Sequence, residues 1–341
     1  MSPVSHRVRD LGLGVGPTPV GPTNSIVDVA GVRVGHTTVT DGTTIFSGAT
    51  AIVVDAASPS APVPAGVFVG NGYGKFVGST QVQELGQLET PIVLTSTLSV
   101  FRAADAIVSW VLREKGEHNT SINPVAGEVN DAWLSSQVRR AVEAEHVMAA
   151  LDGATSKPFR MGNVGGGTGA CALGFKGGIG SSSRVVSEHQ RSVTVGALVQ
   201  TNMDGRLRVA GRTVTPTELA LEPAGPATAD GSCMVVVAVD APLDPNTLRR
   251  IAARSVYALA GVGARFSHGS GDYGVAFSSR ATPAPTRMSD RQTSSIFEAT
   301  MDAVEEAVLD SLLAADTVVS SRGRTAHALP VDAISAAGAS V

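Results

Sequence analysis

Short runs of apolar residues, each bounded by Gly, Pro, Ser or Thr, recur along the chain. Runs of about four to eight residues between turn formers are typical of β-strands. The segment 25–36 alternates apolar residues around a glycine, which predicts a β-hairpin. The other strands that we expect lie at 51–56, 66–72, 91–97, 192–201, 233–241 and 272–279.

Three segments repeat their apolar residues with the period of an α-helix instead, and we expect a fourth helix after the proline-containing turn 240–246. In the clearest one, Val304, Val308 and Leu312 share one face, and Asp and Glu lie on the opposite face. In another, Ala103 and Ile107 are four residues apart, as on one side of a helix. The predicted helices are 103–111, 131–151, 248–259 and 297–312.

The order of these elements indicates the fold class. Strands and helices occur in clusters rather than in strict alternation, which favours a layered α+β sandwich over a doubly wound parallel sheet. Segment 233–241 is almost continuously apolar, as expected of a central strand buried on both faces. Segment 11–24 alternates Gly, Pro and Thr, so we expect irregular chain laid over the body or a flexible arm. Segment 222–231 is the most linker-like internal stretch.

Composition narrows the class of protein. Hydrophobic residues make up 43% of the chain and charged residues only 16%, which argues against disorder. A net charge of −4 gives no basic surface for nucleic acid. No apolar run is long enough to span a membrane, and the first thirty residues lack the apolar core of a signal peptide. We therefore expect a soluble, cytoplasmic protein with neither nucleic acid nor membrane as partner.

The glycine-rich segment 162–184 invites a nucleotide-binding interpretation, which its spacing does not support. Its one lysine, Lys176, is followed by Gly177, so the phosphate-binding P-loop pattern is absent. The dinucleotide fingerprint is absent too, because Gly180 is followed by three serines. We expect these glycines to allow close backbone packing near a site, with a backbone phosphate cradle as the alternative.

Metal and serine-triad chemistry are also poorly supported. The seven histidines are scattered without an H-E-x-x-H pattern, and the two cysteines lack zinc-site spacing, so we expect no metal or cofactor. Neither Ser232 nor Ser270 has the glycine two positions earlier that a nucleophile elbow needs. A triad using His268 as base for Ser270 is a minor alternative.

The junction between the linker-like stretch and the buried strand suggests another chemistry. Gly231 is free to turn its carbonyl towards the hydroxyl of Ser232. Attack of that hydroxyl would form an ester, and water would then cut the chain. The exposed α-amine, with a pKa of about 7.7–8.0, could act as the base for its own hydroxyl. From these residues alone, an ordinary Asp-Gly turn before a strand is the more common interpretation.

Motifs along almost the whole chain favour self-cleavage at this junction over an ordinary turn. The sequence resembles the self-processing β-aminopeptidase and D-stereospecific aminopeptidase/esterase family of the DmpA/BapA type. The resemblance implies a four-layer α-β-β-α sandwich, shared with ornithine acetyltransferases, and a single unit 1–341 cleaved into chains 1–231 and 232–341. The matching motifs are SIVDVAGVRVGHTTV, VFVGNGYGK, ELGQLETPIVLTSTLSV, GEVNDAWL, GNVGGGTGACALGFKGGIGSSSRV, TVGALVQTN, DGSCMVVVAVDAPL, LRRIAARS and SGDYGVAFS.

The same resemblance implies roles for individual residues. Ser232 matches the nucleophile that follows the cleavage point. Asn202 matches the asparagine whose amide polarises the scissile carbonyl, although an asparagine closing a strand is the alternative. Ser270 and Asp272 match a second serine and its acidic partner, which would orient Ser270 and hold the amine or hydroxyl of Ser232. Without the family, S-G-D is a common loop before a strand.

The segment around residue 130 departs from the family pattern. Trp133 stands where the family usually has tyrosine, and an indole can donate a hydrogen bond but cannot relay a proton. We expect Trp133 to wall the substrate pocket. Glu128 and Asp131 are candidates to bind the free ammonium of a substrate, with solvated acids at a helix N-terminus as the alternative.

The resemblance thus predicts a hydrolase that removes N-terminal residues from short peptides, amides or esters through an acyl-enzyme. It also implies a homo-oligomer of processed heterodimers. Three alternatives remain at this level. One is an acyltransferase of the ornithine acetyltransferase type, which has threonine at the junction. The others are an endo-amidase acting on ω-amino acid oligomers and a binding module that has lost the chemistry.

Overall fold

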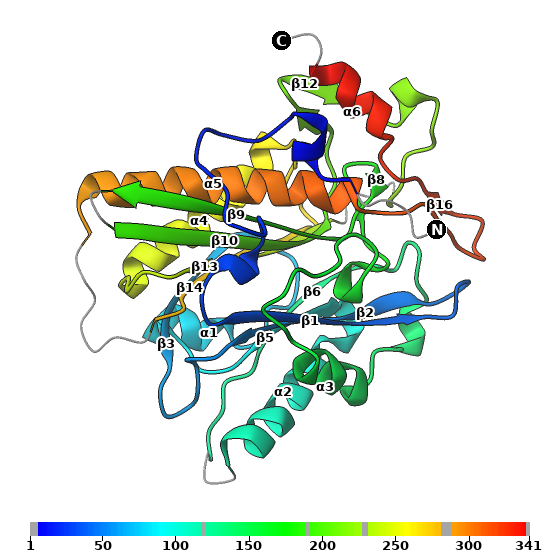
Figure 1. The fold of residues 1–341 in the computed structure, drawn as a ribbon. Helices are drawn as coiled ribbons and strands as arrows, with labels where there is room; N and C mark the ends of the chain where they lie inside the picture. Colours follow the sequence, from blue (N-terminus) through cyan, green and yellow to red (C-terminus); the bar gives the residue numbers. More distant parts are fainter. Residues whose placement is uncertain (1–5, 117–119, 189–190, 227–230, 281–287, 339–341) are drawn as a thin grey trace.

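Two β-sheets stack face to face, and helices cover the outer face of each (Figure 1). Helices α4 (Pro245–Gly261) and α5 (Asp290–Leu313) pack on one sheet, and α2 (Val100–Lys115) and α3 (Ala144–Asp152) pack on the other. This is the expected four-layer α-β-β-α sandwich. The computed structural model describes residues 6–116, 120–188, 191–226, 231–280 and 288–338.

The sheet beneath α4 and α5 has six strands and contains the candidate nucleophile. Its order is β4 (Gln87–Leu88), β3 (Val63–Gly72), β14 (Gly271–Ser278), β13 (Ser232–Val239), β10 (Arg191–Asn202) and β9 (Ile179–Glu188). Only β13 and β14 are paired in parallel within this sheet. The other sheet has the order β1 (Val32–Thr40), β2 (Phe46–Val54), β5 (Ile92–Ser96) and β6 (Val125–Val129).

Strand β13 is the central, doubly buried strand that its apolar run predicts. Cys233 and Val235 face the core beneath α4 and α5. Met234 and Val236 face the core between the two sheets. Because a strand points successive side chains to opposite faces, an apolar run without alternation requires cover on both sides.

Smaller elements surround the ends of the sheets. The described chain contains no helix that is both long and apolar enough to cross a bilayer. The short helices are α1 (Ser79–Leu85) and α6 (Val331–Gly338), and the short strand pairs are β7 (Cys171–Ala172) with β8 (Phe175–Lys176), β11 (Leu207–Val209) with β12 (Arg212–Val214), and β15 (Val318–Val319) with β16 (Thr325–Ala326).

Two predictions of secondary structure are wrong. The hairpin predicted at 25–36 is a 3₁₀ turn, Ile26–Asp28, followed by β1, which pairs with β2. The Asp28 carboxylate accepts the backbone N–H groups of Thr23 and Ser25, and these bonds close the turn.

The helix predicted over 131–151 is the other error, because only α3 forms there. Leu134 is buried in a separate small cluster beside the β7–β8 hairpin. Val138, placed on the predicted apolar stripe, is 85% exposed. Arg140 has a φ of +45°, which ends any continuous helix before α3 begins.

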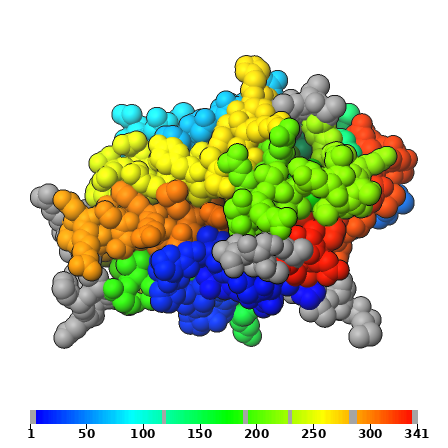
Figure 2. Space-filling view, turned by 90° about the horizontal axis from the view of Figure 1, so that it is seen from above, coloured from blue at the N-terminus to red at the C-terminus, as the bar shows by residue number. Residues whose placement is uncertain are grey.

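The N-terminal segment is laid over α5 rather than free (Figure 2, blue against orange). The acidic residues of α5 expected on its solvent face include Glu306 and Asp310, which are fully buried. Glu306 pairs with Arg184 at 2.8 Å and with Arg9 at 2.8 Å, and Asp310 pairs with Arg7 at 2.7 Å. Buried carboxylates of this kind require cationic partners.

Replacing Arg9 by alanine should lower the free energy of unfolding by about 1.5–3 kcal/mol, the usual range for a hydrogen bond to a charged group. The side chain donates to both oxygens of the buried Glu306 carboxylate. Arg33 offers a control, because its partner Asp55 is about half exposed rather than buried, and such a pair should contribute less than about 1 kcal/mol. If urea denaturation gave the Arg9 and Arg33 variants equal losses of unfolding free energy, the N-terminal segment would not be anchored as described.

Candidate active site

Ser232 opens β13 at one end of the six-stranded sheet, between two neighbouring strands. It lies directly opposite Asn202 of β10 and beside Gly271 of β14. The Ser232 hydroxyl donates to the carbonyl oxygen of Gly231 at 2.6 Å. The N–H of Gly271 donates to the same oxygen at 3.3 Å. The hydroxyl is therefore held against the carbonyl of the bond that precedes it, and that carbonyl is polarised by two donors.

Gly231 approaches the neighbouring chain too closely for any side chain. A Cβ atom at this position would lie 2.9 Å from the backbone nitrogen of Asp204 and 3.0 Å from Cα of Met203. Glycine is thus required here by close approach, in addition to the turning of its carbonyl that the sequence suggested. Of the linker-like stretch 222–231, residues 227–230 lie outside the described chain.

Asn202 ends β10 with its side-chain amide fixed at both ends. Its Oδ1 accepts the backbone N–H of Cys171 at 2.9 Å, and its Nδ2 donates to the carbonyl of Asn130 at 3.0 Å. An amide nitrogen carries two N–H groups, and the described residues accept only one of them, which leaves the other for a ligand in the cavity that Asn202 lines. A donor held in this way costs no reorganisation when charge develops on a nearby oxygen.

Ser270 is buried in the turn before β14, and Asn71 holds that turn in place. The Asn71 amide donates to the carbonyls of Ser267 at 2.9 Å and of Ser270 at 2.5 Å. The N–H of Tyr73 donates to the carbonyl of Ser270 at 3.1 Å. The NGYGK motif therefore fixes the position of the second serine, a role that the sequence did not reveal.

Asp272 lies beside Cys233, one residue from Ser232. Burial raises the pKa of its carboxyl to about 6, a hydrogen bond from Ser270 opposes that shift, and the charge of Asp204 adds to it. Its Oδ2 is buried without a hydrogen-bond partner in the described chain. An unpartnered carboxylate oxygen on the residue that accepts from Ser270 is a ready acceptor for an ammonium or hydroxyl group.

Asp204 is a further acidic residue at the site that sequence reasoning missed. It lines the cavity next to Asn202, and its Oδ2 accepts the hydroxyl of Ser267 at 2.7 Å. Its position two residues after Asn202 is the only signal in the sequence that could have suggested it.

Glu128 and Asp131 are both buried, so the alternative of solvated acids at a helix N-terminus is wrong. Glu128 accepts the backbone N–H of Lys75 at 3.0 Å and pairs with its ammonium at 3.5 Å. Asp131 accepts the hydroxyl of Ser47 at 2.8 Å, and burial raises its pKa to about 7. One oxygen of each carboxyl group has no partner among the described residues. Neither residue belongs to the described cavity walls.

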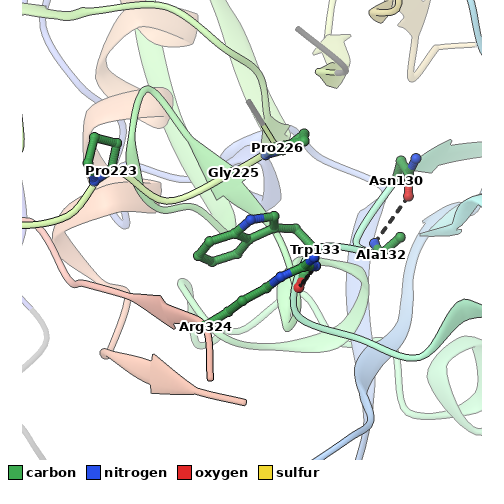
Figure 3. Close-up of a pocket in the computed structure, with 7 residues that line it drawn as sticks. All are labelled: Asn130, Ala132, Trp133, Pro223, Gly225, Pro226 and Arg324. Carbon is green, nitrogen blue, oxygen red and sulfur yellow. Dashed lines mark hydrogen bonds between the residues drawn. The ribbon is translucent and has the colours of Figure 1, made fainter. Parts of the chain in front are cut away.

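Two adjoining cavities lie beside Asn202. The smaller, about 230 Å³, includes Asn202, Trp133, Asp204 and Cys171 in its wall. The larger, about 570 Å³, extends past Trp133 towards the β15–β16 hairpin (Figure 3). Trp133 thus lies in the wall of both, where we expected it. The residues common to both walls are Asn130, Trp133, Pro223, Gly225 and Pro226.

The glycine-rich segment packs backbone against backbone, as its spacing suggested. Lys176 is fully buried and donates to the carbonyls of Gly167, Ala170 and Gly177 at 2.7–3.1 Å. Burial lowers its pKa to about 8. A Cβ atom at Gly180 would lie 1.9 Å from a carbonyl oxygen of α5. The lysine is therefore committed to the protein's own carbonyls rather than to a phosphate.

Comparison with known proteins agrees with this architecture. The model of peptidase family S58 matches residues 24–326. Beta-peptidyl aminopeptidase BapA of Sphingosinicella microcystinivorans is 37% identical over 95% of this chain and 89% of its own length. A Burkholderia sp. beta-aminopeptidase superposes with a TM-score of 0.88 at 36% identity, covering 97% of this chain and 98% of that one.

A third relative is the L-aminopeptidase D-Ala-esterase/amidase of Ochrobactrum anthropi. It superposes with a TM-score of 0.87 at 33% identity over 97% of both chains. That enzyme is described as a prototype for the serine aminopeptidases and as a new variant of the Ntn hydrolase fold. The two stacked sheets and their helical cover therefore form a variant of the Ntn hydrolase fold in this chain as well.

Proposed function

The chain belongs to peptidase family S58, and we propose that it is an aminopeptidase that activates itself by cleaving the bond between Gly231 and Ser232. Its nucleophile would then be an amino-terminal serine. The observation that carries the proposal is the Ser232 hydroxyl resting on the Gly231 carbonyl at 2.6 Å, beside Asn202.

Self-cleavage needs only groups on the chain and one water. The Ser232 oxygen attacks the carbonyl carbon of Gly231 and loses its proton. The carbon–nitrogen bond breaks, the Ser232 nitrogen takes up a proton, and an ester remains. Water then hydrolyses the ester, which leaves a carboxylate on Gly231 and both a free amine and a free hydroxyl on Ser232. The hydrogen bond from Gly271 to the carbonyl favours the first step by polarising it.

The exposed amine would serve as general base in turnover. It takes the proton of the Ser232 hydroxyl as that oxygen attacks the substrate carbonyl, and returns it to the leaving amine or alcohol. Asn202 donates to the oxyanion. The Asp272 carboxylate orients Ser270 and holds the ammonium form of the new N-terminus. A water then releases the acyl group and regenerates the serine.

The substrates proposed are short peptides, amides or esters with a free N-terminal amine. The named relatives act as β-peptidyl aminopeptidases and as an L-aminopeptidase and D-Ala-esterase/amidase. The unpartnered oxygens of Glu128 and Asp131 support recognition of an ammonium, since both residues are close in the chain to Asn130, whose carbonyl holds the Asn202 amide. An ammonium would also satisfy these two buried carboxyl groups.

The decisive assay compares a short peptide with its N-acetylated form. We expect the enzyme to release the N-terminal residue of the free peptide and to leave the N-acetylated peptide uncut. Equal cleavage of both, or release of internal fragments, would contradict an aminopeptidase.

The rate of self-cleavage should rise as the pH increases through about 6. The pKa of Asp272 is raised to about 6, so below that pH its carboxyl is protonated and cannot orient Ser270 as an anion. The rate is measured on purified precursor shifted between buffers of pH 5 and pH 8. An Asp272→Asn variant should cleave more slowly and lose this step in its pH profile. A step of the same size in the variant would assign the titration to another group.

A further inference from the structure

Arg324 brings a positive charge into the wall of the larger cavity. It precedes β16 in the C-terminal hairpin and lies 191 residues along the chain from Trp133, whose carbonyl accepts its Nη1 at 2.7 Å. The guanidinium carbon is 5.7 Å from the centroid of the Trp133 ring. Figure 3 shows the arginine side chain lying along the indole, with Pro223, Gly225 and Pro226 around the same cavity.

The charge of Arg324 is not neutralised by the described part of the protein. None of the ion pairs found there involves Arg324. The described wall of the larger cavity contains no acidic residue and no other charged side chain. A guanidinium has five N–H donors, and the Trp133 carbonyl takes one of them. Donors remain for an anionic ligand, and their planar geometry suits a carboxylate.

Asn130 lies in the wall of the cavity that Arg324 also lines. Glu128 and Asp131, close to Asn130 along the chain, are buried, and Figure 3 shows Arg324 across the cavity from Asn130. The smaller cavity continues from the larger one to Asn202 beside Ser232. A ligand reaching from the nucleophile past Trp133 would therefore meet the positive charge of Arg324 at the end remote from the nucleophile.

We propose that Arg324 binds the C-terminal carboxylate of short peptide substrates, so that the enzyme prefers free peptides to their amides. This inference rests on the proposed aminopeptidase function and adds the recognition of the leaving part of the substrate. Since the arginine contacts neither Ser232 nor Asn202, its contribution is to binding.

The test compares a dipeptide with the same dipeptide amidated at its C-terminus. In Arg324→Gln, kcat/KM for the free dipeptide should fall about tenfold or more, through KM, because a charge-assisted bond is lost. The value for the amide should change less than about twofold, and Arg324→Lys should recover part of the loss, since it keeps the charge without the planar fork.

Arg322→Gln is the matched control. Arg322 is exposed and donates to the carbonyl of Ala132 at 3.0 Å but does not line the cavity. It should leave the ratio between the two substrates at the wild-type value. Equal losses on both substrates in Arg324→Gln, or no loss on either, would overturn the inference while leaving the aminopeptidase standing. Failure of the wild-type enzyme to cleave either compound would overturn the proposed function and this inference with it.

Discussion

Replacing Ser232 by alanine should leave the purified protein as one uncut chain and lower peptide hydrolysis by on the order of 10⁴-fold or more, as removal of a nucleophile does. The variant lacks the hydroxyl oxygen of residue 232, which lies against the Gly231 carbonyl and would attack it. Without scission, no free amine forms at position 232 to act as base. Both losses follow from one atom, so they should appear together.

Ser278 provides the control for this substitution. It is an equally buried serine near the far end of the neighbouring strand, and its hydroxyl donates to the carbonyl of Ala241 at 2.7 Å. Ser278→Ala should still cleave itself and hydrolyse peptides. Gel electrophoresis and a peptide-release assay measure the two properties. Full activity in an uncut Ser232→Ala protein would exclude Ser232 as the nucleophile.

Removing the side-chain donor of Asn202 should lower kcat about 10²–10³-fold, the effect of losing one oxyanion donor. Asn202→Asp is the sharper variant, because its carboxylate can still accept the N–H of Cys171 while offering no N–H to the developing oxyanion. Self-cleavage should slow as well, since Asn202 lies directly opposite Ser232.

A matched control for the asparagine is Asn163→Ala. Asn163 donates to the carbonyl of Asp316 at 2.9 Å and does not line either cavity. It should leave kcat within about twofold of the wild-type value, as expected for substitutions away from a site. A rise in KM with unchanged kcat in Asn202→Asp would assign the amide to ground-state binding instead.

The layers of the fold could be predicted because their signals are local. The short apolar run from Cys233 to Val239, bounded by turn formers, favours a strand covered on both faces, and the predicted helix 297–312 lies within α5. The turn at Gly231 followed by a strand from Ser232 was visible for the same reason, whereas its interpretation as a cleavage point came from the family resemblance.

What could not be predicted depends on contacts between distant segments. Glu306 appeared to lie on a solvated face because the arginines that bury it come from the N-terminal segment and from β9. Asp204 becomes part of the site only when β10 and the turn before β14 meet. Arg324 reaches Trp133 through a hairpin far along the chain. The periodicity of apolar residues within one segment does not indicate which distant side chains will contact it.

The central claim is that the chain cuts itself between Gly231 and Ser232, and the mass of the intact protein tests it directly. Purified wild-type protein, measured when fresh and after prolonged incubation, should resolve into two chains, 1–231 and 232–341, whose masses together exceed that of the precursor by one water. A single unchanged mass in a preparation that hydrolyses peptides would contradict the account.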